Sequence, residues 1–340
     1  MKEILFQFGL TEENFQVISF GSGLINTTWK VADKQGNAKY ILQKVNQQIF
    51  KEPGDIAFNT RLIGNYMVEH SPGYLFVSPI VTIRGDELVK SDDGFYRMFP
   101  FVLKSHTIDV VEKPQQAYEA AKQFGRFTKL LSGLVTGQLK ITLPDFHDLS
   151  LRYQQFEKAL ETGNAERIAQ SKDLIATIKA NKNIVDEYQV CKEKFTIRVT
   201  HHDTKISNVL FDEKEKGLCV IDLDTVMPGY FISDVGDMMR TYLCPVSEEE
   251  KDFSKIFIRK EFYNAVVDGY TSEMGVELTE IEKQHIHYAG EFMIYMQALR
   301  FLTDHLNNDI YYGAKYEGHN FVRAGNQATL LQHLQEFIIG

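Results

Sequence analysis

The chain reads His201-His202-Asp203-Thr204-Lys205-Ile206-Ser207-Asn208, and fourteen positions after Asn208 it reaches Asp222 within Val220-Ile221-Asp222-Leu223-Asp224. Residues 208–211 and 218–221 are short apolar runs, and the charged segment 212–217 between them ends in Gly, which predicts a β-hairpin. Because an antiparallel hairpin places the start of its first strand beside the end of its second, Asn208 and Asp222 are expected to be neighbours. Asp203, five residues before Asn208, lies at the same end of the hairpin.

These side chains have the chemistry that phosphoryl transfer requires. A carboxylate at Asp203 can accept the proton of an attacking hydroxyl, while the side-chain oxygens of Asn208 and Asp222 suit Mg²⁺ on nucleotide phosphates. Each residue alone could instead cap a turn or end a strand, but their joint spacing around one hairpin favours the catalytic interpretation. Asp224 lies two residues beyond Asp222, on the same face if the strand continues. It is either a second metal ligand or a structural acceptor.

The composition of the 340 residues is that of an ordinary globular chain, with 44% hydrophobic and 24% charged residues. The net charge of −9 argues against a general nucleic-acid-binding protein, which is usually basic. No apolar run reaches the roughly eighteen residues of a membrane span, and the first residues lack the apolar core of a secretion signal. We therefore expect a cytoplasmic protein without a membrane partner. The three cysteines are widely spaced, which supports neither a disulfide framework nor a Cys-x-x-Cys metal site.

The first hundred residues are predicted to be rich in β-strands, at 15–20, 27–32 and 39–45, with a turn at 34–37. The connection between the first two strands is Gly21-Ser22-Gly23-Leu24-Ile25-Asn26. Glycines let a backbone approach phosphate oxygens and point its N–H groups at them. Gly21, Ser22, Gly23 and Asn26 are therefore candidate nucleotide-binding residues, with a plain tight turn as the alternative.

Lys44 stands near the end of the third strand, where a kinase keeps the lysine that contacts the α- and β-phosphates. A solvated strand lysine is the alternative. Gln43 faces the opposite side of the strand, so an error of one residue in register would exchange the two. The helix expected over 55–70 offers only Glu69, late in the helix, as the glutamate that usually pairs with such a lysine.

Two more strands are expected at 77–84 and 94–101, and residues 97–102 would connect a first lobe to a second. The rest of the chain has helical spacing. Helices are expected over 114–131, 151–160, 165–180, 233–240, 247–272 and 279–306. The sequence therefore predicts an α+β fold, with a small β-rich N-terminal lobe over 1–102 that binds the nucleotide and a larger, mainly helical lobe over 103–340.

Together, these motifs resemble the aminoglycoside phosphotransferase and choline kinase superfamily over essentially the whole chain. The metal-binding segment has the Ile-Asp form of that superfamily, and the Asp-Phe-Gly of ordinary protein kinases is absent. Within it, the chain is most similar to bacterial N-acetylhexosamine 1-kinases. The similarity rests on Tyr40-Ile41-Leu42-Gln43-Lys44-Val45-Asn46, His202-Asp203-Thr204-Lys205, Asp222-Leu223-Asp224-Thr225-Val226-Met227-Pro228-Gly229, Arg300-Phe301-Leu302-Thr303-Asp304-His305-Leu306 and Asp309-Ile310-Tyr311-Tyr312.

The resemblance implies a protein-kinase-like, two-lobed fold. It also implies ATP-dependent phosphorylation, with Mg²⁺, of the anomeric hydroxyl of N-acetylglucosamine or N-acetylgalactosamine. Arg300 and Tyr311 would bind the sugar; from their sequence context alone, Arg300 would be an exposed helix residue and Tyr311 a packing residue. His147 fits the same family and is expected to be structural, while His201 is expected to orient the catalytic loop.

Two other functions stay open from the sequence. The same machinery serves kinases of other small alcohols, of the aminoglycoside, choline or homoserine type, because acceptor identity lies outside the motif. A nucleotide-binding pseudokinase with a protein partner is an alternative from a different class, which intact Asp203, Asn208 and Asp222 disfavour. In every kinase interpretation the partners are ATP and a small sugar or alcohol.

Overall fold

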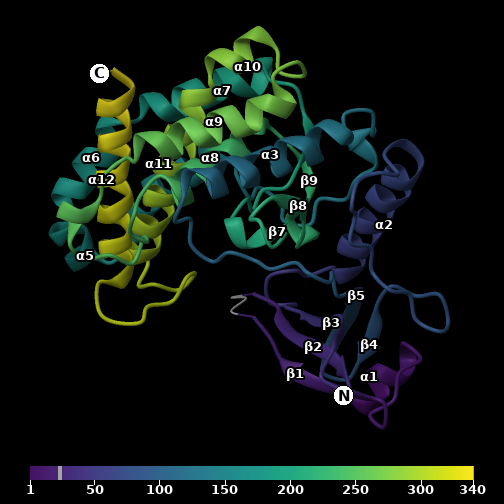
Figure 1. Cartoon of the computed structure of the whole chain (residues 1–340). Coiled ribbons are helices and arrows are strands. Elements are labelled where there is room, and N and C mark those ends of the chain that lie inside the picture. The colour runs from purple at the N-terminus through teal and green to yellow at the C-terminus, as the bar shows by residue number, and fades with distance from the viewer. Residues whose placement is uncertain (22–24, 340) are drawn as a thin grey trace.

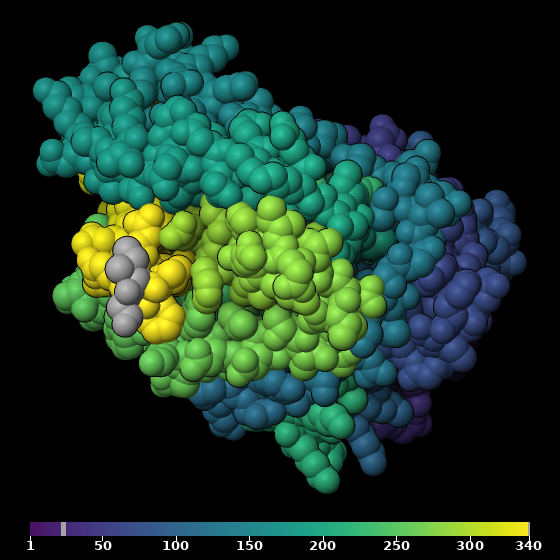
Figure 2. All heavy atoms as spheres, turned by 90° about the horizontal axis from the view of Figure 1, so that it is seen from above, coloured from purple at the N-terminus to yellow at the C-terminus, as the bar shows by residue number. Residues whose placement is uncertain are grey.

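In the computed structural model, which describes residues 1–21 and 25–339, the chain forms a small β-sheet lobe and a larger helical lobe (Figure 1). Seen from above, the N-terminal part in purple and blue occupies one side of the molecule (Figure 2). This is the predicted α+β, two-lobed architecture. The boundary expected between residues 102 and 103 stays a prediction; it falls between Pro100, where the last strand of the sheet ends, and Pro114, where the next helix begins.

The sheet of the N-terminal lobe is antiparallel, with strand order β1-β2-β3-β5-β4. One face packs on α1 (Lys2–Gln7), with Leu42 and Met98 fully buried. Because side chains alternate along a strand, the neighbouring Gln43 and Arg97 border the space between the lobes. The strands are β1 (Phe15–Ser19), β2 (Thr27–Asp33), β3 (Ala38–Val45), β4 (Val89–Ser91) and β5 (Gly94–Pro100).

Helix α2 (Pro53–His70) stands between the sheet and the helical lobe (Figure 1). Its Asn59 is 1% exposed and donates its amide N–H groups to the backbone oxygens of Lys140 at 2.9 Å and Val226 at 3.1 Å. The oxygen of the same amide accepts the backbone N–H of Lys140 at 2.8 Å. A buried amide that is satisfied in this way ties α2 to the helical lobe.

The core of the helical lobe forms where α3 (Pro114–Leu130) packs on α9 (Lys260–Met274), and where α11 (Ile286–Leu306) packs on α8 (Phe231–Tyr242) and α12 (His319–Ile339). Gly269 lets α3 and α9 come close, because a Cβ there would overlap the backbone oxygen of Tyr118. The remaining helices are α4 (Leu149–Thr162), α5 (Ala165–Gln170), α6 (Lys172–Ala180), α7 (Asn183–Lys194) and α10 (Glu280–Gln284), with 3-10 turns at Thr136–Gln138 and Phe253–Lys255.

Two short pairs of antiparallel strands lie between the helices of this lobe and the sheet. The predicted hairpin is present as β7 (Val209–Phe211) and β8 (Gly217–Val220), and a second antiparallel pair joins β6 (Arg198–Thr200) to β9 (Met227–Gly229). Single 3-10 turns, Ile206–Asn208 and Leu223–Thr225, precede β7 and follow β8. The loop 201–205 therefore leaves β6 and enters the turn that precedes β7.

The strand expected over 77–84 is wrong. Within this segment only Ile80 bridges to the sheet, opposite Met98, and β4 forms the edge instead. The Thr82 hydroxyl accepts the backbone N–H of Arg84 at 3.3 Å and of Asp86 at 3.0 Å, which closes a local turn. That turn ends any extended run.

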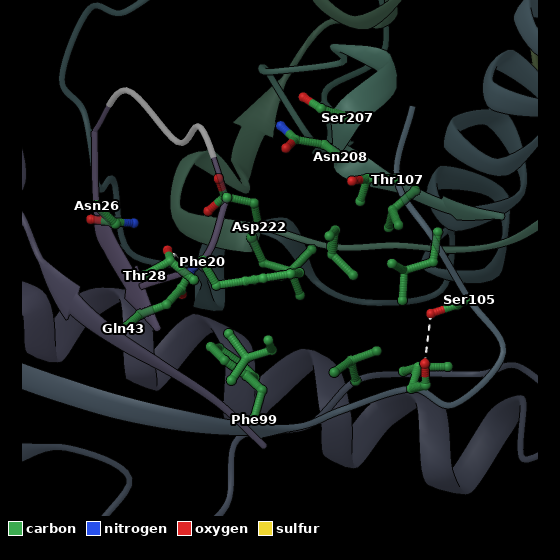
Figure 3. A pocket seen from close by; sticks show the side chains of 18 of the residues that line it. Phe20, Asn26, Thr28, Gln43, Phe99, Ser105, Thr107, Ser207, Asn208 and Asp222 are labelled. Carbon is green, nitrogen blue, oxygen red and sulfur yellow. Dashed lines mark hydrogen bonds between the residues drawn. The ribbon is translucent and has the colours of Figure 1, made fainter. Parts of the chain in front are cut away.

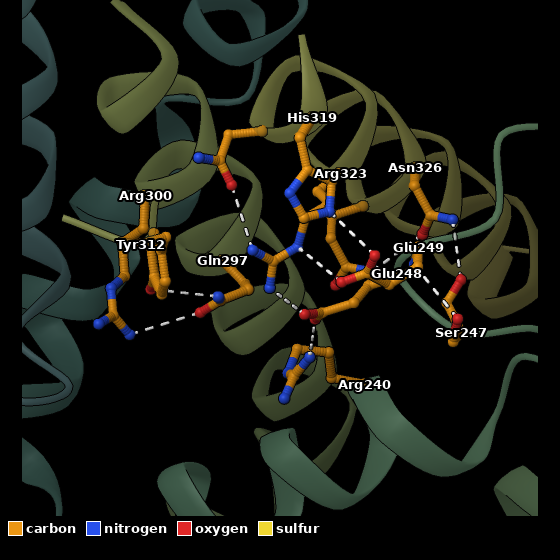
Figure 4. Close-up of polar contacts among 12 residues, drawn as sticks. Arg240, Ser247, Glu248, Glu249, Gln297, Arg300, Tyr312, His319, Arg323 and Asn326 are labelled. Atoms are coloured by element: carbon orange, nitrogen blue, oxygen red, sulfur yellow. Dashed lines mark hydrogen bonds and ion pairs between the residues drawn. The ribbon is translucent and has the colours of Figure 1, made fainter. Parts of the chain in front are cut away.

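The helix expected over 247–272 begins only at Lys260. The preceding segment is held by long-range contacts instead (Figure 4). Glu248 accepts from Arg240 at 2.7 Å and from Arg323, and Asn326 donates to the backbone oxygens of Ser247 and Glu250 at 3.1 Å each. These partners fix the backbone in a non-helical form. The segments 165–180 and 279–306 are each divided into two helices, at Ser171 and at His285.

Cys191, Cys219 and Cys244 are buried and free, so none of the three cysteines of the chain forms a disulfide. Within residues 1–21 and 25–339, no helix combines the length and the apolar character that crossing a membrane requires.

Candidate active site

A cleft of about 700 Å³ lies between the two lobes (Figure 3). From the helical lobe it is lined by Asp203, Asn208 and Asp222, which the structure brings together as the sequence predicts. Phe99 of β5 and Val102 of the segment after it contribute an apolar part. An apolar wall beside convergent polar groups is the usual composition of a small-molecule site.

The loop before Asp203 is fixed by a buried carboxylate of α8. Asp234 is 1% exposed and accepts the backbone N–H of His201 at 3.1 Å and of His202 at 2.8 Å. Burial raises the pKa of Asp234 to about 7. His201 itself is fully buried, and its Nε2 contacts the backbone oxygen of Ile221 at 3.0 Å. This contact joins the loop to the end of the hairpin and fits the orienting role expected for His201.

The residue after Asp203 is held by a second carboxylate of the same helix. Asp237 accepts the backbone N–H of Thr204 at 2.9 Å, and the guanidinium of Arg240 donates to Asp237 at 3.0 Å. The carboxylate of Asp203 is 21% exposed and pairs with Nζ of Lys205 at 3.1 Å. Asp203 is thus a cleft-facing acid on a loop that is anchored on both sides.

Asn208 and Asp222 meet at the open end of the hairpin, as predicted. The side-chain N–H of Asn208 donates to the backbone oxygen of Asp203 at 2.9 Å, which leaves the amide oxygen of Asn208 available to a cation. Asp222 has φ of 60° and points into the cleft (Figure 3). Burial, together with the carboxylate of Asp224, raises the pKa of Asp222 to about 7. The carboxylate of Asp222 and the free amide oxygen of Asn208 are hard oxygen donors, the kind of ligand that suits Mg²⁺.

Asp224 is 2% exposed, and both of its oxygens have partners in the N-terminal lobe. Oδ1 lies 2.5 Å from Nη1 of Arg97, and Oδ2 accepts the side-chain N–H of Asn26 at 2.8 Å. Of the two roles that the sequence left open, the geometry favours the structural acceptor over the metal ligand. Asp224 joins the two lobes at the back of the cleft.

The placement predicted for Lys44 is wrong by one residue of register. Its Nζ pairs with Asp93 at 2.8 Å and lies 5.8 Å from the ring of Tyr96, and Lys44 is not among the described residues that line the cleft. Gln43 lines the cleft in its place. Glu69, the only glutamate that the helix over 55–70 offered as a partner for Lys44, is exposed at the end of α2, and Lys44 pairs with Asp93 instead.

The loop proposed to contact phosphates is described only in part. Gly21 lines the cleft with φ of 80°, a left-handed conformation that glycine adopts without strain. Ser22 and Gly23 lie outside the described residues. Asn26 also lines the cleft, but its amide is occupied by Asp224 and by the backbone N–H of Asn46 at 3.0 Å. Both polar groups of the Asn26 side chain are therefore already engaged within the protein.

Arg300 and Tyr311, the residues implied to bind sugar, lie together at a second hollow of about 410 Å³. Nη2 of Arg300 lies 3.4 Å from the hydroxyl of Tyr311. Tyr311 is 70% exposed, so it is not the packing residue that its context suggested. The carboxylate of Asp304 accepts the backbone N–H groups of Tyr311 at 2.7 Å and Tyr312 at 2.9 Å, which fixes this segment beside α11.

The second hollow is basic. Arg152 of α4 donates to the backbone oxygen of Asp145 at 2.9 Å and to the amide oxygen of Gln155 at 3.1 Å, and its Nε is buried without a hydrogen-bond partner. Arg300 donates to the amide oxygen of Gln297 at 3.4 Å (Figure 4). Among the residues that the structure describes, neither arginine forms an ion pair. Burial, with the charge of Arg300, lowers the pKa of Arg152.

Phe146 and His147 connect the second hollow to the loop that carries Asp203. The guanidinium of Arg300 lies 5.8 Å from the centre of the Phe146 ring, and Nδ1 of His147 lies 3.4 Å from Nδ1 of His202, the residue before Asp203. Burial lowers the pKa of His147 well below its ordinary value, so the ring is neutral and packed. This agrees with the structural role expected for His147.

The sequence profile of the phosphotransferase enzyme family matches residues 16–264, more than half of the chain and both lobes. This chain belongs to the phosphotransferase enzyme family. The match includes the hairpin with Asp203, Asn208 and Asp222, the residues that line the cleft from the helical lobe.

Solved structures with the same fold include an aminoglycoside phosphotransferase from Alicyclobacillus acidocaldarius, which is 12% identical with a TM-score of 0.66 and covers 100% of this chain and 96% of its own. A spectinomycin phosphotransferase in complex with ADP and spectinomycin is 12% identical, with a TM-score of 0.60 and coverage of 98% and 97%. A choline kinase from Cryptosporidium parvum is 11% identical, with a TM-score of 0.55 and coverage of 97% and 91%. At these identities the likeness shows the kinase-like fold of the family.

Sequence reasoning missed Arg97 as a cleft residue of this phosphotransferase. It treated residues 97–102 only as a connection between lobes, although Arg97 is a charged residue inside an otherwise apolar strand. Such a residue is almost never fully buried unless it is paired. That exception to the strand pattern was the signal that could have found it.

Proposed function

We propose that this phosphotransferase is an ATP-dependent kinase that phosphorylates the anomeric C1 hydroxyl of N-acetylhexosamines. Its products would be ADP and the 1-phosphate of N-acetylglucosamine or N-acetylgalactosamine. The observation that carries the kinase part is the convergence of Asp203, Asn208 and Asp222 in one interlobe cleft. The presence of ADP in a spectinomycin phosphotransferase of the same fold supports ATP as the phosphoryl donor. The reaction would take place in the cytoplasm, where ATP is supplied, as a step of carbohydrate metabolism.

In this proposal ATP occupies the cleft, with its base near Phe99 and Val102 and its phosphates beneath the loop that begins at Gly21. Asn208 and Asp222 would hold Mg²⁺, which neutralises phosphate charge as transfer proceeds. Asp203 orients the C1 hydroxyl of the sugar and accepts its proton. Phosphoryl transfer passes through a loose transition state with little bond formation to the attacking oxygen. Positioning of the hydroxyl by the anchored loop would therefore contribute more to the rate than removal of its proton.

The charge of the second hollow supports a sugar over the other acceptors. Choline and ethanolamine are cations, and aminoglycosides carry several amines, so unpaired positive charge close to the acceptor would repel them. Within the described part of the chain, Arg152 and Arg300 place two positive charges without ion-pair partners there. The one carboxylate among the described residues that line the hollow, that of Asp304, already accepts the backbone N–H groups of Tyr311 and Tyr312. A neutral sugar can accept hydrogen bonds from a guanidinium through its hydroxyl and N-acyl oxygens. Arg300 and Tyr311 would bind the sugar from the side of α11, while its C1 hydroxyl reaches Asp203.

The test is Mg²⁺-dependent release of ADP from ATP with N-acetylglucosamine, N-acetylgalactosamine, galactose, choline, homoserine and an aminoglycoside. We expect turnover with the N-acetylhexosamines, and phosphorus NMR of the product should show an anomeric phosphate. Asp203→Asn should reduce kcat by about 100-fold or more while ADP binding is kept. Asp186→Asn, at an exposed position of α7, is the matched control and should behave as the unaltered protein.

Two results would count against the proposal. Turnover with another acceptor alone would keep the assignment as a kinase but rule out the N-acetylhexosamine as its substrate. Binding of ATP without turnover of any acceptor would instead favour a pseudokinase.

A further inference from the structure

The cleft receives one strongly basic side chain from the sheet. Among the described residues that line it, Arg97 of β5 is the only lysine or arginine from the N-terminal lobe. Ser22, Gly23 and Leu24, which lie outside the described residues, carry no charge. Lys44 lies on the other face of the sheet, bound to Asp93. The positive charge that kinases place on the third strand is therefore supplied here from the fifth.

The guanidinium of Arg97 is held in a fixed orientation. Gln43, its partner across the β3–β5 ladder, accepts from Nε at 3.1 Å and from Nη2 at 2.9 Å through a single amide oxygen. Asp224 holds Nη1 from the opposite lobe at 2.5 Å. Only 5% of Arg97 is exposed, and such a planar fork, once oriented, loses little freedom when it binds an anion.

Arg97 is also next to the proposed metal ligand. Its Nη2 lies 3.9 Å from Oδ1 of Asp222, too far for a hydrogen bond but close enough for attraction. Phosphates that approach a cation at Asp222 would therefore meet this Nη2. A guanidinium beside the proposed metal ligand suits the negative charge that builds up on the phosphates during transfer.

We propose that Arg97 binds the phosphates of the nucleotide, in the role that the kinase fold usually gives to a lysine of the third strand. The inference rests on the nucleotide site of the proposed function but not on the identity of the acceptor. Gln43 and Asp224 are then positioning residues that orient Arg97. The competing explanation is that Arg97 only joins the lobes through its ion pair with Asp224.

Matched variants separate these explanations. Arg97→Gln and Lys44→Gln each remove one positive charge from the sheet, and calorimetry would measure the binding of ADP and of adenosine, which lacks phosphates. We expect Arg97→Gln to weaken ADP binding by about 10- to 100-fold and adenosine binding by less than about twofold. Lys44→Gln should change neither affinity. The melting temperature of each variant is measured alongside.

Equal weakening of ADP and adenosine by Arg97→Gln would mean that Arg97 only joins the lobes, and would overturn the proposal. A loss of affinity in Lys44→Gln that is selective for ADP would also overturn the proposal. If Arg97→Gln does not fold, Arg97→Lys keeps the charge, and a smaller loss that is still selective for ADP is expected; equal effects on both ligands would again overturn it. No acceptor is present in these measurements, so a failure of the sugar assignment would not affect their outcome.

Discussion

Thr204 donates its backbone N–H to the carboxylate of Asp237 at 2.9 Å, one residue after Asp203. The same carboxylate holds Arg240, whose Nη1 donates to Glu248 at 2.7 Å (Figure 4). The position of the loop that carries Asp203 therefore depends on a series of buried ion pairs that begins on α8. Removing one member leaves its partner buried and uncompensated, which is costly.

We predict that Asp237→Asn lowers kcat by about tenfold, because a weaker acceptor at Thr204 loosens the loop that carries Asp203. Binding of ADP should change little, since Asp237 does not line the cleft. Steady-state kinetics with saturating ATP and calorimetry with ADP would measure the two effects separately. The exposed Asp186→Asn serves as control, and an equal loss of kcat and of ADP affinity would contradict a positioning role.

We predict that Arg300→Met raises KM for the N-acetylhexosamine by about tenfold or more, because a charged hydrogen-bond donor to the sugar is lost. Activity with choline, relative to the sugar, should rise as the hollow becomes less positive. Initial rates over a range of each acceptor would show both changes. Arg61→Met removes an arginine whose side chain is 53% exposed and should leave KM unchanged. An unchanged KM in Arg300→Met would exclude Arg300 from the acceptor site.

We predict that acid weakens the fold through its buried histidines. Burial lowers the pKa of His202 to about 4, so His202 is neutral in the folded chain but takes up a proton on unfolding between about pH 4 and 6.5. The contribution of neutral His202 to the free energy of unfolding is complete above pH 6.5 and is lost as the pH falls to 4. Its size is about 3 kcal/mol. Burial shifts the pKa values of His147 and His201 in the same direction.

Urea unfolding at several pH values would test this, with His202→Asn as the variant, since Asn tolerates the positive φ of 66° at this position. Its free energy of unfolding should depend less steeply on pH between 4 and 6.5 than that of the unaltered protein. The raised pKa of Asp234 acts in the opposite direction in both proteins, because its stabilising effect is lost as the pH rises toward 7. The difference between the two proteins in the slope of unfolding free energy against pH therefore reports on His202 alone. Equal slopes would show that His202 does not contribute to the acid sensitivity.

We predict that Gly269→Ala destabilises the chain by about 1–3 kcal/mol, because its Cβ would overlap the backbone oxygen of Tyr118 and force α3 and α9 apart. Gly54→Ala is the matched control, because nothing lies within 4 Å of a Cβ at that position of α2. It should leave stability unchanged or raise it by up to about 1 kcal/mol through helix propensity. Melting curves of the two variants would decide, and similar melting temperatures would count against the close approach.

The hairpin with Asn208 and Asp222 was predictable because its information is local: two apolar runs, a charged turn and a glycine lie within fifteen residues. The same holds for β1, β2, β3 and β5. The register of Lys44 was not predictable, because Gln43 and Lys44 are both polar and the choice between them is made by Asp93 and Arg97, which belong to other parts of the sheet.

Long-range pairs explain the other misses. Asn26 and Asp224 are 198 residues apart, so no local pattern could show that Asp224 is occupied from the N-terminal lobe. The segment from Ser247 has the spacing of a helix, yet Arg323 and Asn326 of α12 hold it in another form. A helical pattern gives only a tendency, which specific buried partners overcome.

The burial of all three cysteines has a practical consequence for studies of lobe motion. Burial raises the pKa values of Cys191 and Cys219 to about 12 and also raises that of Cys244, and the reactive thiolate is scarce at neutral pH when a thiol pKa is high. Maleimide dyes would therefore react slowly with the native thiols. A pair of cysteines introduced on the surface, one in each lobe, could carry fluorophores without removing any native residue. Energy transfer between them would report whether the distance between the lobes changes when a nucleotide is added.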